Sequence, residues 1–517
     1  MKLQENPLTI LLTILTCLLL TTSCSKEEKN PYRDLSMEYY SSIAEEPLKI
    51  DAAAIRAKIS RMYRSDSDSL NADQRTRRYY RNAAHHKDML LWISRQGVSP
   101  QADTLLACLD SCHADGFKDS QFRLDQIRTD MARIKAMEFT DATPADESIS
   151  IVLARLEYNL TKAFLRYAVG QRFGFVNPAD RMNHLDIRDS DSIHTTYRQL
   201  FDIPIYNAGK QTYNDAIRAI RNDSVGWYLQ IAQPKTSIYQ ALKRKLAHTT
   251  NASERERLII NMERARWRTT DYPDLHKEYV IVNIPAYHLW AMRDGKNATD
   301  MRIGCGSRDT KTPLLYSKIK RMDINPQWVI PGSIKKKDIA RHAGNAAYFE
   351  SNHYFAMNRH TGKRLDTYAI PYDIILSADW AIVQEGGEGN SLGRIIFRFD
   401  NNFSVFLHDT SSRGVFARED RSVSHGCVRV EQPYDLACYM LRGEDQEMAE
   451  RIKYSMETDI SAEDCDRSRL VSSVKVDPQI PLYIVYYTAF PVPGHGVQTF
   501  PDVYGYDDII AQLLKAL

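Results

Sequence analysis

The residues best suited to chemistry lie around position 427, where a histidine, a glycine and a cysteine are adjacent. The sequence reads Ser424-His425-Gly426-Cys427, and a second histidine, His408, precedes it. A cysteine is nucleophilic as the thiolate, and a nearby imidazole can accept the thiol proton. A glycine lets the backbone turn sharply and present N–H groups to an oxyanion. The pattern fits thiol catalysis, and the alternative is a buried thiol beside two incidental histidines.

Other cysteines and histidines fit a reactive site less well. Three residues separate Cys108 from Cys112-His113, whereas haem attachment needs two, and the sequence offers no second pair of zinc ligands. We interpret this segment as a helix with two core thiols, His85-His86 as surface, and Cys305 as a packed thiol on a strand. The sequence lacks H-E-x-x-H and G-x-x-x-x-G-K-[ST], which disfavours a metallopeptidase and a phosphate-binding loop.

The first half of the chain must supply helices. Between residues 50 and 270 apolar side chains recur at helical spacing, and one such run ends at Gly170, where we expect the helix to stop. The run consists of Leu153, Leu156, Leu160, Phe164 and Tyr167. The polar faces carry many arginines, which we interpret as solvated helix surface: Arg75, Arg77, Arg78 and Arg81.

The second half must supply the strands that hold His408 and Cys427. After Pro273 the sequence contains short runs rich in β-branched residues. These runs predict strands at 279–285, 395–399, 404–407 and 482–487. Residues 335–390, rich in Lys, His, Asn and Tyr, read as an insertion between strands that could act as a lid. The chain is therefore expected to be an α+β protein, with a helical region followed by a β-rich one.

Composition narrows the functional class. The 517 residues predict two to four domains, and 43% hydrophobic with 26% charged residues excludes a disordered chain. Lys and Arg number 68 against 66 Asp and Glu, too even for a general nucleic-acid binder. A mean hydropathy of -0.45 argues against a polytopic membrane protein. These values fit a multidomain enzyme.

The N-terminus has the features of an export signal. The apolar stretch Leu8–Leu20 has 13 residues, too few for a stable membrane span. It is followed by Thr21-Thr22-Ser23-Cys24, which resembles a bacterial lipobox; an ordinary cleaved signal is the alternative. We expect a lipoprotein signal peptide at 1–23, lipidation of Cys24 and a tether at 24–45. Without Cys17 and Cys24, six of the eight cysteines remain, and their spacings show no disulfide framework.

The spacing of the motif resembles a known family. Fifteen residues separate His408 from Ser424, and this arrangement is similar to the L,D-transpeptidase catalytic domain of the YkuD type. Further segments resemble its large, scaffold-bearing Gram-negative branch (YcbB-like): 282–287, 312–314, 325–331, 389–394 and 501–505, with 257–267 resembling the end of its scaffold. The resemblance implies an α-helical scaffold domain at 46–272 and a mixed, β-rich catalytic domain at 273–517, with a capping (lid) subdomain inserted at about 335–390. Many relatives carry a peptidoglycan-binding module in the scaffold, but here Trp227–Leu246 runs almost directly into Ser253.

The same resemblance implies roles for individual residues. Cys427 is the nucleophile, His408 the general base, and the backbone carbonyl of Asp409 orients His408. His425 shapes the pocket, the N–H groups of Gly426 and Cys427 form the oxyanion hole, and Arg429 positions Cys427 or binds a carboxylate. The residues expected to contact substrate are Ser424, Trp328, Asn390, Gly393 and Arg394.

The implied activity is peptidoglycan L,D-transpeptidation. Cys427 attacks the carbonyl of the third residue of a stem tetrapeptide, releases D-Ala and passes the acyl group to an amine of another stem; carbapenems acylate the same thiol in the family. The alternatives are an L,D-carboxypeptidase, an enzyme that attaches a lipoprotein to the wall or detaches it, and a non-catalytic wall-binding lipoprotein. No metal, organic cofactor or nucleic acid is implied, and the oligomeric state stays open. The protein is expected in the periplasm of a Gram-negative bacterium, held to the outer membrane by a lipid anchor.

Overall fold

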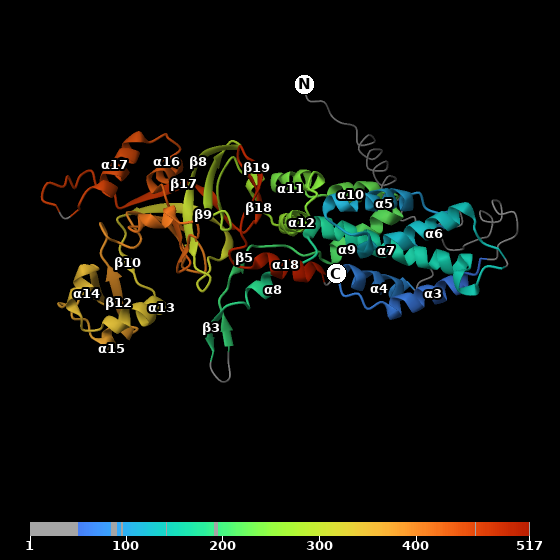
Figure 1. Ribbon diagram of the computed structural model, residues 1–517, viewed down its shortest axis with the longest axis horizontal. Coiled ribbons are helices and arrows are strands. Elements are labelled where there is room, and N and C mark those ends of the chain that lie inside the picture. The colour runs from blue at the N-terminus through green and yellow to red at the C-terminus, as the bar shows by residue number, and fades with distance from the viewer. Residues whose placement is uncertain are drawn as a thin grey trace, which may run out of the picture. The chain divides into compact units, whose positions relative to one another are not determined.

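The computed structural model describes residues 50–83, 90–94, 97–140, 142–190, 195–460 and 462–515 (Figure 1). The expected signal peptide, the lipidated Cys24, the tether and His85-His86 lie outside these residues. The chain divides into two units, one of residues 1–171 and 208–233 and the other of 172–207 and 234–517. No helix in the described ranges has both the length and the apolar character that crossing a membrane requires.

The first unit is built around one long buried helix. Its helices are α3 (Ala52–Ser65), α4 (Asn71–Ala83), α5 (Gln101–Asp110), α6 (Leu124–Ala136), α7 (Ile149–Phe173), α9 (Lys210–Arg221) and α10 (Val225–Ala232). Helix α7 is buried on nearly all sides, so its polar side chains need internal partners. Lys162 binds Asp66 and Asp68 at 2.6 Å each, and Glu157 accepts the N–H groups of Leu91 and Trp92 at 2.6 and 2.9 Å.

Two details of this unit differ from expectation. Helix α7 does not stop at Gly170 but continues to Phe173, because a buried glycine is tolerated where tertiary packing holds the helix. Arg77 is not simply solvated: it donates to the carbonyl of Asp68 at 2.6 Å.

The second unit contains a large sheet that closes on itself. Its path is β13 (Ile395–Phe399), β14 (Leu407–His408), β16 (Val428–Val430), β8 (Lys296–Gly306), β7 (His288–Arg293), β6 (Glu278–Asn283), β17 (Ser473–Val485) and β9 (Leu314–Ile324). Strand β13 also pairs with β9, so the path returns to its start. The short strands β5 (Phe201–Asp202) and β15 (Ser422–Ser424) pair with β9 and β8. Alternating residues such as Val280, Val282, Leu407 and Val428 fill the core.

Helices and small hairpins complete the second unit. They are α8 (Ala179–Met182), α11 (Ser237–Ala247), α12 (Ala252–Arg266), α16 (Pro433–Met440), α17 (Gln446–Glu457) and α18 (Tyr506–Lys515), with the hairpins β3–β4 (Ile187–Ser190, Thr195–Tyr197) and β18–β19 (Ala489–Val492, Gly496–Thr499). The expected scaffold residues 172–207 and 234–272 thus pack with the β-rich unit, and the domain boundary at 272 stays a prediction.

The segment between β9 and β13 folds around a core of its own. It has a sheet of β10 (Trp328–Val329), β12 (Trp380–Gln384) and β11 (Tyr354–Asn358), with short helices α13 (Gly332–Ile334), α14 (Ala346–Ser351) and α15 (Tyr372–Leu376). Ile330, Phe349, Ile370 and Ile382 are fully buried in it. The structure adds β10 to the insertion expected at about 335–390, and we call the whole of 325–394 the insertion.

The α+β class, with helices first and a β-rich region after them, is confirmed. The strand expected at 404–407 is wrong for its first three residues, since β14 covers only Leu407 and His408. Asn401 accepts hydrogen bonds from the N–H groups of Phe403 and Val405, which makes a turn there instead.

Candidate active site

His408 and Cys427 lie at neighbouring strands of the closed sheet. Strands β14 and β16 are parallel, with Leu407 opposite Val428 and His408 opposite Arg429. Leu407 and Val428 point into the core, so alternation places His408 and Arg429 on the other face. Cys427 directly precedes β16. Because neighbouring strands are ~4.8 Å apart, the sheet brings the thiol and the imidazole to the same place.

The imidazole of His408 is held in one orientation and is neutral. Its Nδ1 donates to the backbone carbonyl of Asp409, which leaves Nε2 as the unprotonated nitrogen. Burial lowers the pKa of His408 to about 4; the Asp409 carbonyl opposes this shift and the positive charge of Arg429 adds to it. A backbone hydrogen bond at Leu392 also opposes this shift. A neutral histidine with an unprotonated Nε2 is suited to accept a proton.

The Cys427 thiol is also neutral in this structure. Burial raises the pKa of Cys427 to about 11, although the backbone at Phe406 and the charge of Arg429 both favour the thiolate. Its Sγ lies 4.0 Å from the carbonyl oxygen of Ser404, and among the described residues no hydrogen bond joins it to His408. Burial therefore favours the uncharged forms of both the thiol and the imidazole.

Asp409 is fixed by the chain that precedes β13. Its Oδ2 accepts the N–H of Arg394 at 2.9 Å and its Oδ1 accepts from Arg413 at 3.1 Å. Gly393 has φ +65°, and a Cβ built on it would lie 2.4 Å from the Asp409 Cβ. The glycine therefore allows this loop to pack directly against the residue that orients His408.

Three residues expected to contact substrate make internal contacts in this structure, and their contact with substrate stays a prediction. Asn390 is 1% exposed, and its amide donates to the carbonyls of Pro326 and Glu385 at 3.2 and 2.6 Å. Arg394 donates to the Asn325 side chain at 3.2 Å, and Trp328 packs against the core of the insertion. These contacts join the two ends of the insertion, so the structure indicates positioning roles for these residues.

Hydrogen bonds of the Ser424 side chain fix the conformation of the Ser-His-Gly-Cys segment. The Ser424 hydroxyl donates to the Cys427 carbonyl at 2.6 Å and accepts the Gly426 N–H at 3.1 Å. Gly426 has φ +117°, a conformation that favours glycine. Of the two N–H groups expected in the oxyanion hole, that of Gly426 is engaged here, while that of Cys427 has no acceptor among the described residues.

A turn after β8 supports the same segment from outside, and sequence reasoning assigned it no role. Thr310 donates to the Ser424 carbonyl at 2.7 Å, and Thr312 donates to the Gly426 carbonyl at 2.9 Å while accepting the Gly306 N–H at 2.8 Å. The Tyr504 hydroxyl donates to the Gly306 carbonyl at 2.6 Å. Thr312 and Tyr504 stand in segments that resemble the family, but contacts over 100 residues apart are not readable from the sequence.

A cleft opens beside the motif. A cavity of about 700 Å³ is lined by His425 and Gly426, by the turn at 309–313, by the insertion and by the β3–β4 hairpin. His425 is half-exposed, and its Nε2 lies 3.7 Å from Asp338 of the insertion. Basic residues in the lining include Arg188, Arg198 and Lys337. The lining also contains Asp309 and Asp338, and it reaches Gly426, the residue directly before Cys427.

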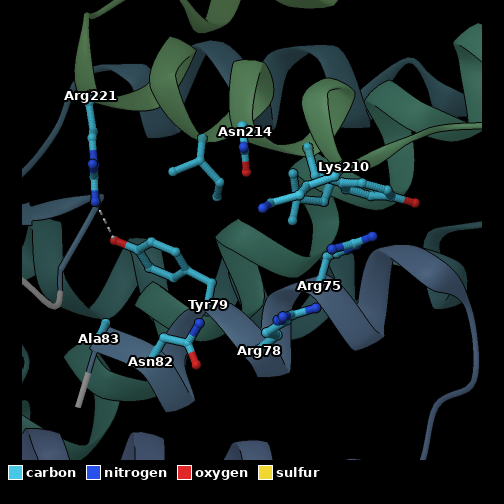
Figure 2. A pocket seen from close by; sticks show the side chains of 11 residues that line it. Arg75, Arg78, Tyr79, Asn82, Ala83, Lys210, Asn214 and Arg221 are labelled. Atoms are coloured by element: carbon cyan, nitrogen blue, oxygen red, sulfur yellow. Dashed lines mark hydrogen bonds between the residues drawn. The ribbon is translucent and has the colours of Figure 1, made fainter. Parts of the chain in front are cut away.

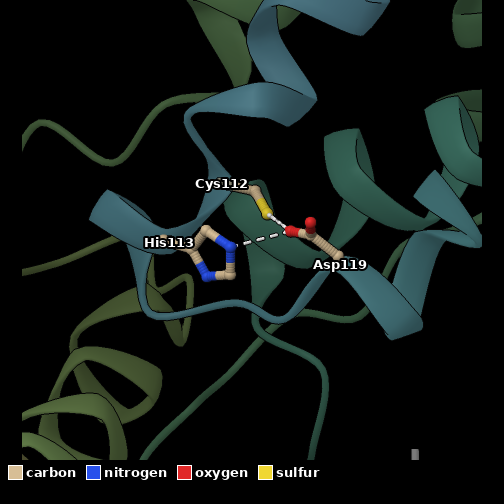
Figure 3. A group of neighbouring side chains, drawn as sticks. All are labelled: Cys112, His113 and Asp119. Carbon is tan, nitrogen blue, oxygen red and sulfur yellow. Dashed lines mark hydrogen bonds and ion pairs between the residues drawn. The ribbon is translucent and has the colours of Figure 1, made fainter. Parts of the chain in front are cut away.

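The other cluster of possible ligands is in the first unit. Cys112, His113 and Asp119 converge (Figure 3), with His113 Nε2 at 2.8 Å and Cys112 Sγ at 3.7 Å from Asp119 Oδ1. Arg128 takes the other Asp119 oxygen at 2.9 Å, and burial raises the pKa of Cys112 to about 12. Metal binding needs the thiolate, so these residues fit a metal poorly. Cys108 lies on α5 outside this cluster, and the six described cysteines form no disulfides with one another.

Comparison with known proteins identifies both regions. Residues 277–448 match the family described as "L,D-transpeptidase catalytic domain" (YkuD), and residues 74–246 match the family described as "Scaffold domain". A Haemophilus influenzae protein named "Putative L,D-transpeptidase" is 26% identical over 306 residues, which cover 58% of this chain and 59% of that protein.

Two solved structures are similar over about half of this chain. One is titled as an "Ldtfm-avibactam carbamoyl enzyme" (12% identity, TM-score 0.19, 47% of this chain and 63% of that one). The other is an Enterococcus faecium L,D-transpeptidase with its cysteine replaced by serine (12% identity, TM-score 0.17, 50% and 70%). These superpositions are too weak to add to the family matches.

Proposed function

Because the chain carries an L,D-transpeptidase catalytic domain behind a scaffold domain, we propose that it cross-links peptidoglycan through an acyl-enzyme on Cys427. The observation that supports this most directly is the His408 imidazole. It is buried beside the strand that follows Cys427 and tied through Nδ1 to the Asp409 carbonyl, with Nε2 left to accept the thiol proton.

The first half-reaction forms a thioester. Cys427 Sγ attacks the carbonyl carbon of the third stem residue while His408 Nε2 takes the thiol proton, because neither group is charged beforehand. The N–H of Cys427 donates to the developing oxyanion. The C–N bond to the terminal D-Ala then breaks, and the imidazolium returns the proton to the leaving amine.

The second half-reaction transfers the acyl group. An amine of another stem, that of diaminopimelate in most Gram-negative walls, attacks the thioester and gives its proton to His408. The C–S bond breaks, the thiol is restored, and a diaminopimelate–diaminopimelate crosslink remains. The insertion lines the cleft beside His425, where it can limit the access of water to the thioester.

The proposed setting is the cell envelope. The substrate polymer lies outside the cytoplasm, and we propose that the protein is held in the periplasm by a lipid on Cys24. The basic residues of the cleft suit the carboxylates of stem peptides.

The test is incubation of the protein with a disaccharide-tetrapeptide and mass spectrometry of protein and products. We expect a thioester on Cys427 and crosslinked dimers. Cys427→Ala should abolish both, whereas Cys465→Ala, which removes another partly exposed thiol, should leave both unchanged. Tripeptide without dimers would establish a carboxypeptidase instead. Neither adduct nor product from folded protein would refute catalysis by Cys427.

A further inference from the structure

A second cavity lies in the helical unit, between α4 and α9. It has a volume of about 480 Å³, which is within the range of small-ligand sites, and Leu165 of α7 also lines it (Figure 2). It belongs to the first unit alone, and the family match to the catalytic domain does not include it.

The cavity is formed by one face of each helix. Arg75, Arg78, Tyr79 and Asn82 follow each other at the i, i+3, i+4, i+7 spacing of a single face of α4. Across the cavity, Lys210, Asn214, Ile217 and Arg221 make the corresponding face of α9. Figure 2 shows Arg75, Arg78, Tyr79 and Asn82 on one helix facing Lys210, Asn214 and Arg221 on the other.

The charges on these faces lack acidic partners. The only acid on α4, Asp73, is fully buried and bound to Arg166 at 2.6 Å, and the only acid on α9, Asp215, binds Arg218 at 3.0 Å. Among the described residues, Arg75, Arg78 and Lys210 have no carboxylate within ion-pair distance. Positive groups that face one another without counter-charge repel, which an anion in the cavity would relieve.

The polar and aromatic side chains that line the cavity suit a ligand larger than a simple ion. Arg221 lies over the Tyr79 ring and donates to its hydroxyl at 3.4 Å, and Arg75 lies over the ring of Tyr213. The Tyr213 hydroxyl is buried without a hydrogen-bond partner in the described part of the chain. Asn82 and Asn214 can each donate to and accept from an amide.

We propose that this cavity is a second binding site, for an acidic peptide segment of the same polymer whose crosslinking is proposed above. Arginine and lysine would take its carboxylates, and the asparagine amides its peptide groups. The inference rests on the proposed function for the identity of the ligand, but not for the existence of the site. The helical unit would then hold wall material independently of the catalytic cleft.

The test uses full-length protein with Cys427→Ala, so that binding is measured without turnover. Titration with the disaccharide-tetrapeptide should show a site that the triple variant Arg75→Ala, Arg78→Ala, Lys210→Ala weakens by about tenfold or more, the effect of one lost charge-assisted hydrogen bond. The matched control, Arg56→Ala, Arg61→Ala, Arg64→Ala, removes the same charge from exposed positions of α3 and should change binding less than twofold. The charge-neutral pair Asn82→Ala, Asn214→Ala should also weaken binding.

The outcomes separate the possible ligands. Equal binding by the triple variant of the cavity (the pocket variant) and by the α3 control would overturn the proposed site. Binding of inorganic pyrophosphate, or of vesicles containing phosphatidylglycerol, that depends on the pocket residues while the tetrapeptide does not bind would overturn the peptide assignment. Thioester formation on Cys427 is measured separately, so failure of the proposed catalysis would not be mistaken for failure of this site.

Discussion

At the scale of single residues, the protonation of His408 and Cys427 decides how the site works. Burial moves their pKa values apart, to about 4 for the imidazole and about 11 for the thiol, so both are uncharged near neutrality. Arg429 lowers both pKa values, favouring the thiolate but opposing the imidazolium. We therefore expect the thiol to lose its proton during attack, and not before it.

This neutrality predicts the pH dependence of alkylation. Only the thiolate reacts with iodoacetamide, so labelling of Cys427 should rise about tenfold per pH unit, without a plateau, from about pH 6 to about pH 10. Peptide mass spectrometry identifies the labelled thiol, and Cys427→Ala provides the blank. Arg429→Met should slow labelling at every pH because it removes a charge that favours the thiolate. A plateau below about pH 8 would reveal a preformed ion pair.

The sequence identifies the residues of the motif but not the residues that hold them in place. His408 and Cys427 are visible because two short segments at fixed spacing contain them; their roles remain predictions. The sequence predicts a substrate contact for Asn390, and it gives no sign that the amide is buried against two carbonyls. Such contacts depend on tertiary packing.

At the scale of elements, the loop before β13 controls the orientation of the base. Gly393→Ala should lower catalysis by about tenfold or more, because the new Cβ would displace Asp409 and its carbonyl. It should also lower the free energy of unfolding through the cost of a left-handed residue, about 1–2 kcal/mol, plus the clash. Acylation kinetics and thermal unfolding measure the two effects.

Gly389→Ala is the control for this change. Gly389 is in the same loop with φ +75°, but its nearest neighbour would be 3.8 Å from a new Cβ. The Gly389→Ala variant has the same backbone strain but no close contact with Asp409. Its stability should therefore fall, while acylation should stay near the wild-type rate. Equal loss of activity in both variants would mean that strain in the loop, and not Asp409, matters.

The turn after β8 makes a second prediction at this scale. Thr312→Val leaves the buried Gly306 N–H and Gly426 carbonyl without their shared partner, and should cost about 3 kcal/mol of unfolding free energy. Thr310→Val should cost about 1 kcal/mol or less, because the Ser424 carbonyl keeps the Ser307 N–H at 2.9 Å. Denaturant unfolding compares the two. A Thr310 variant as unstable as the Thr312 variant would contradict this assignment.

Helices and strands were largely predictable, and their ends were not. Periodicity identifies α7 and β13, but a glycine at 170 does not end a helix that is buried on nearly all sides. Residues 404–406 do not make a strand, because Asn401 forms a turn there. Local propensity yields to tertiary packing in α7 and to the hydrogen bonds of the Asn401 side chain before β14.

At the scale of the whole molecule, the net charge is small, and basic residues are concentrated in two places. The net charge is +2, so general attraction to an anionic polymer is weak. Basic residues instead gather in the cleft of one unit and in the α4–α9 cavity of the other. The division of the chain into these units could not be read from the sequence, because residues 172–207 return to the β-rich unit after α7.

Local charge predicts how salt affects binding to isolated peptidoglycan. Raising ionic strength should weaken binding of the Cys427→Ala protein, because mobile ions screen exposed charges beyond about 10 Å at 0.1 M. The pocket variant and the α3 control each change the net charge from +2 to -1, since +2 − 3 = -1. If facing cations hold the polymer, co-sedimentation should show a shallower salt dependence only for the pocket variant. Identical slopes for the two variants would show that net charge governs association, and the α4–α9 cavity would then have no part in holding the wall.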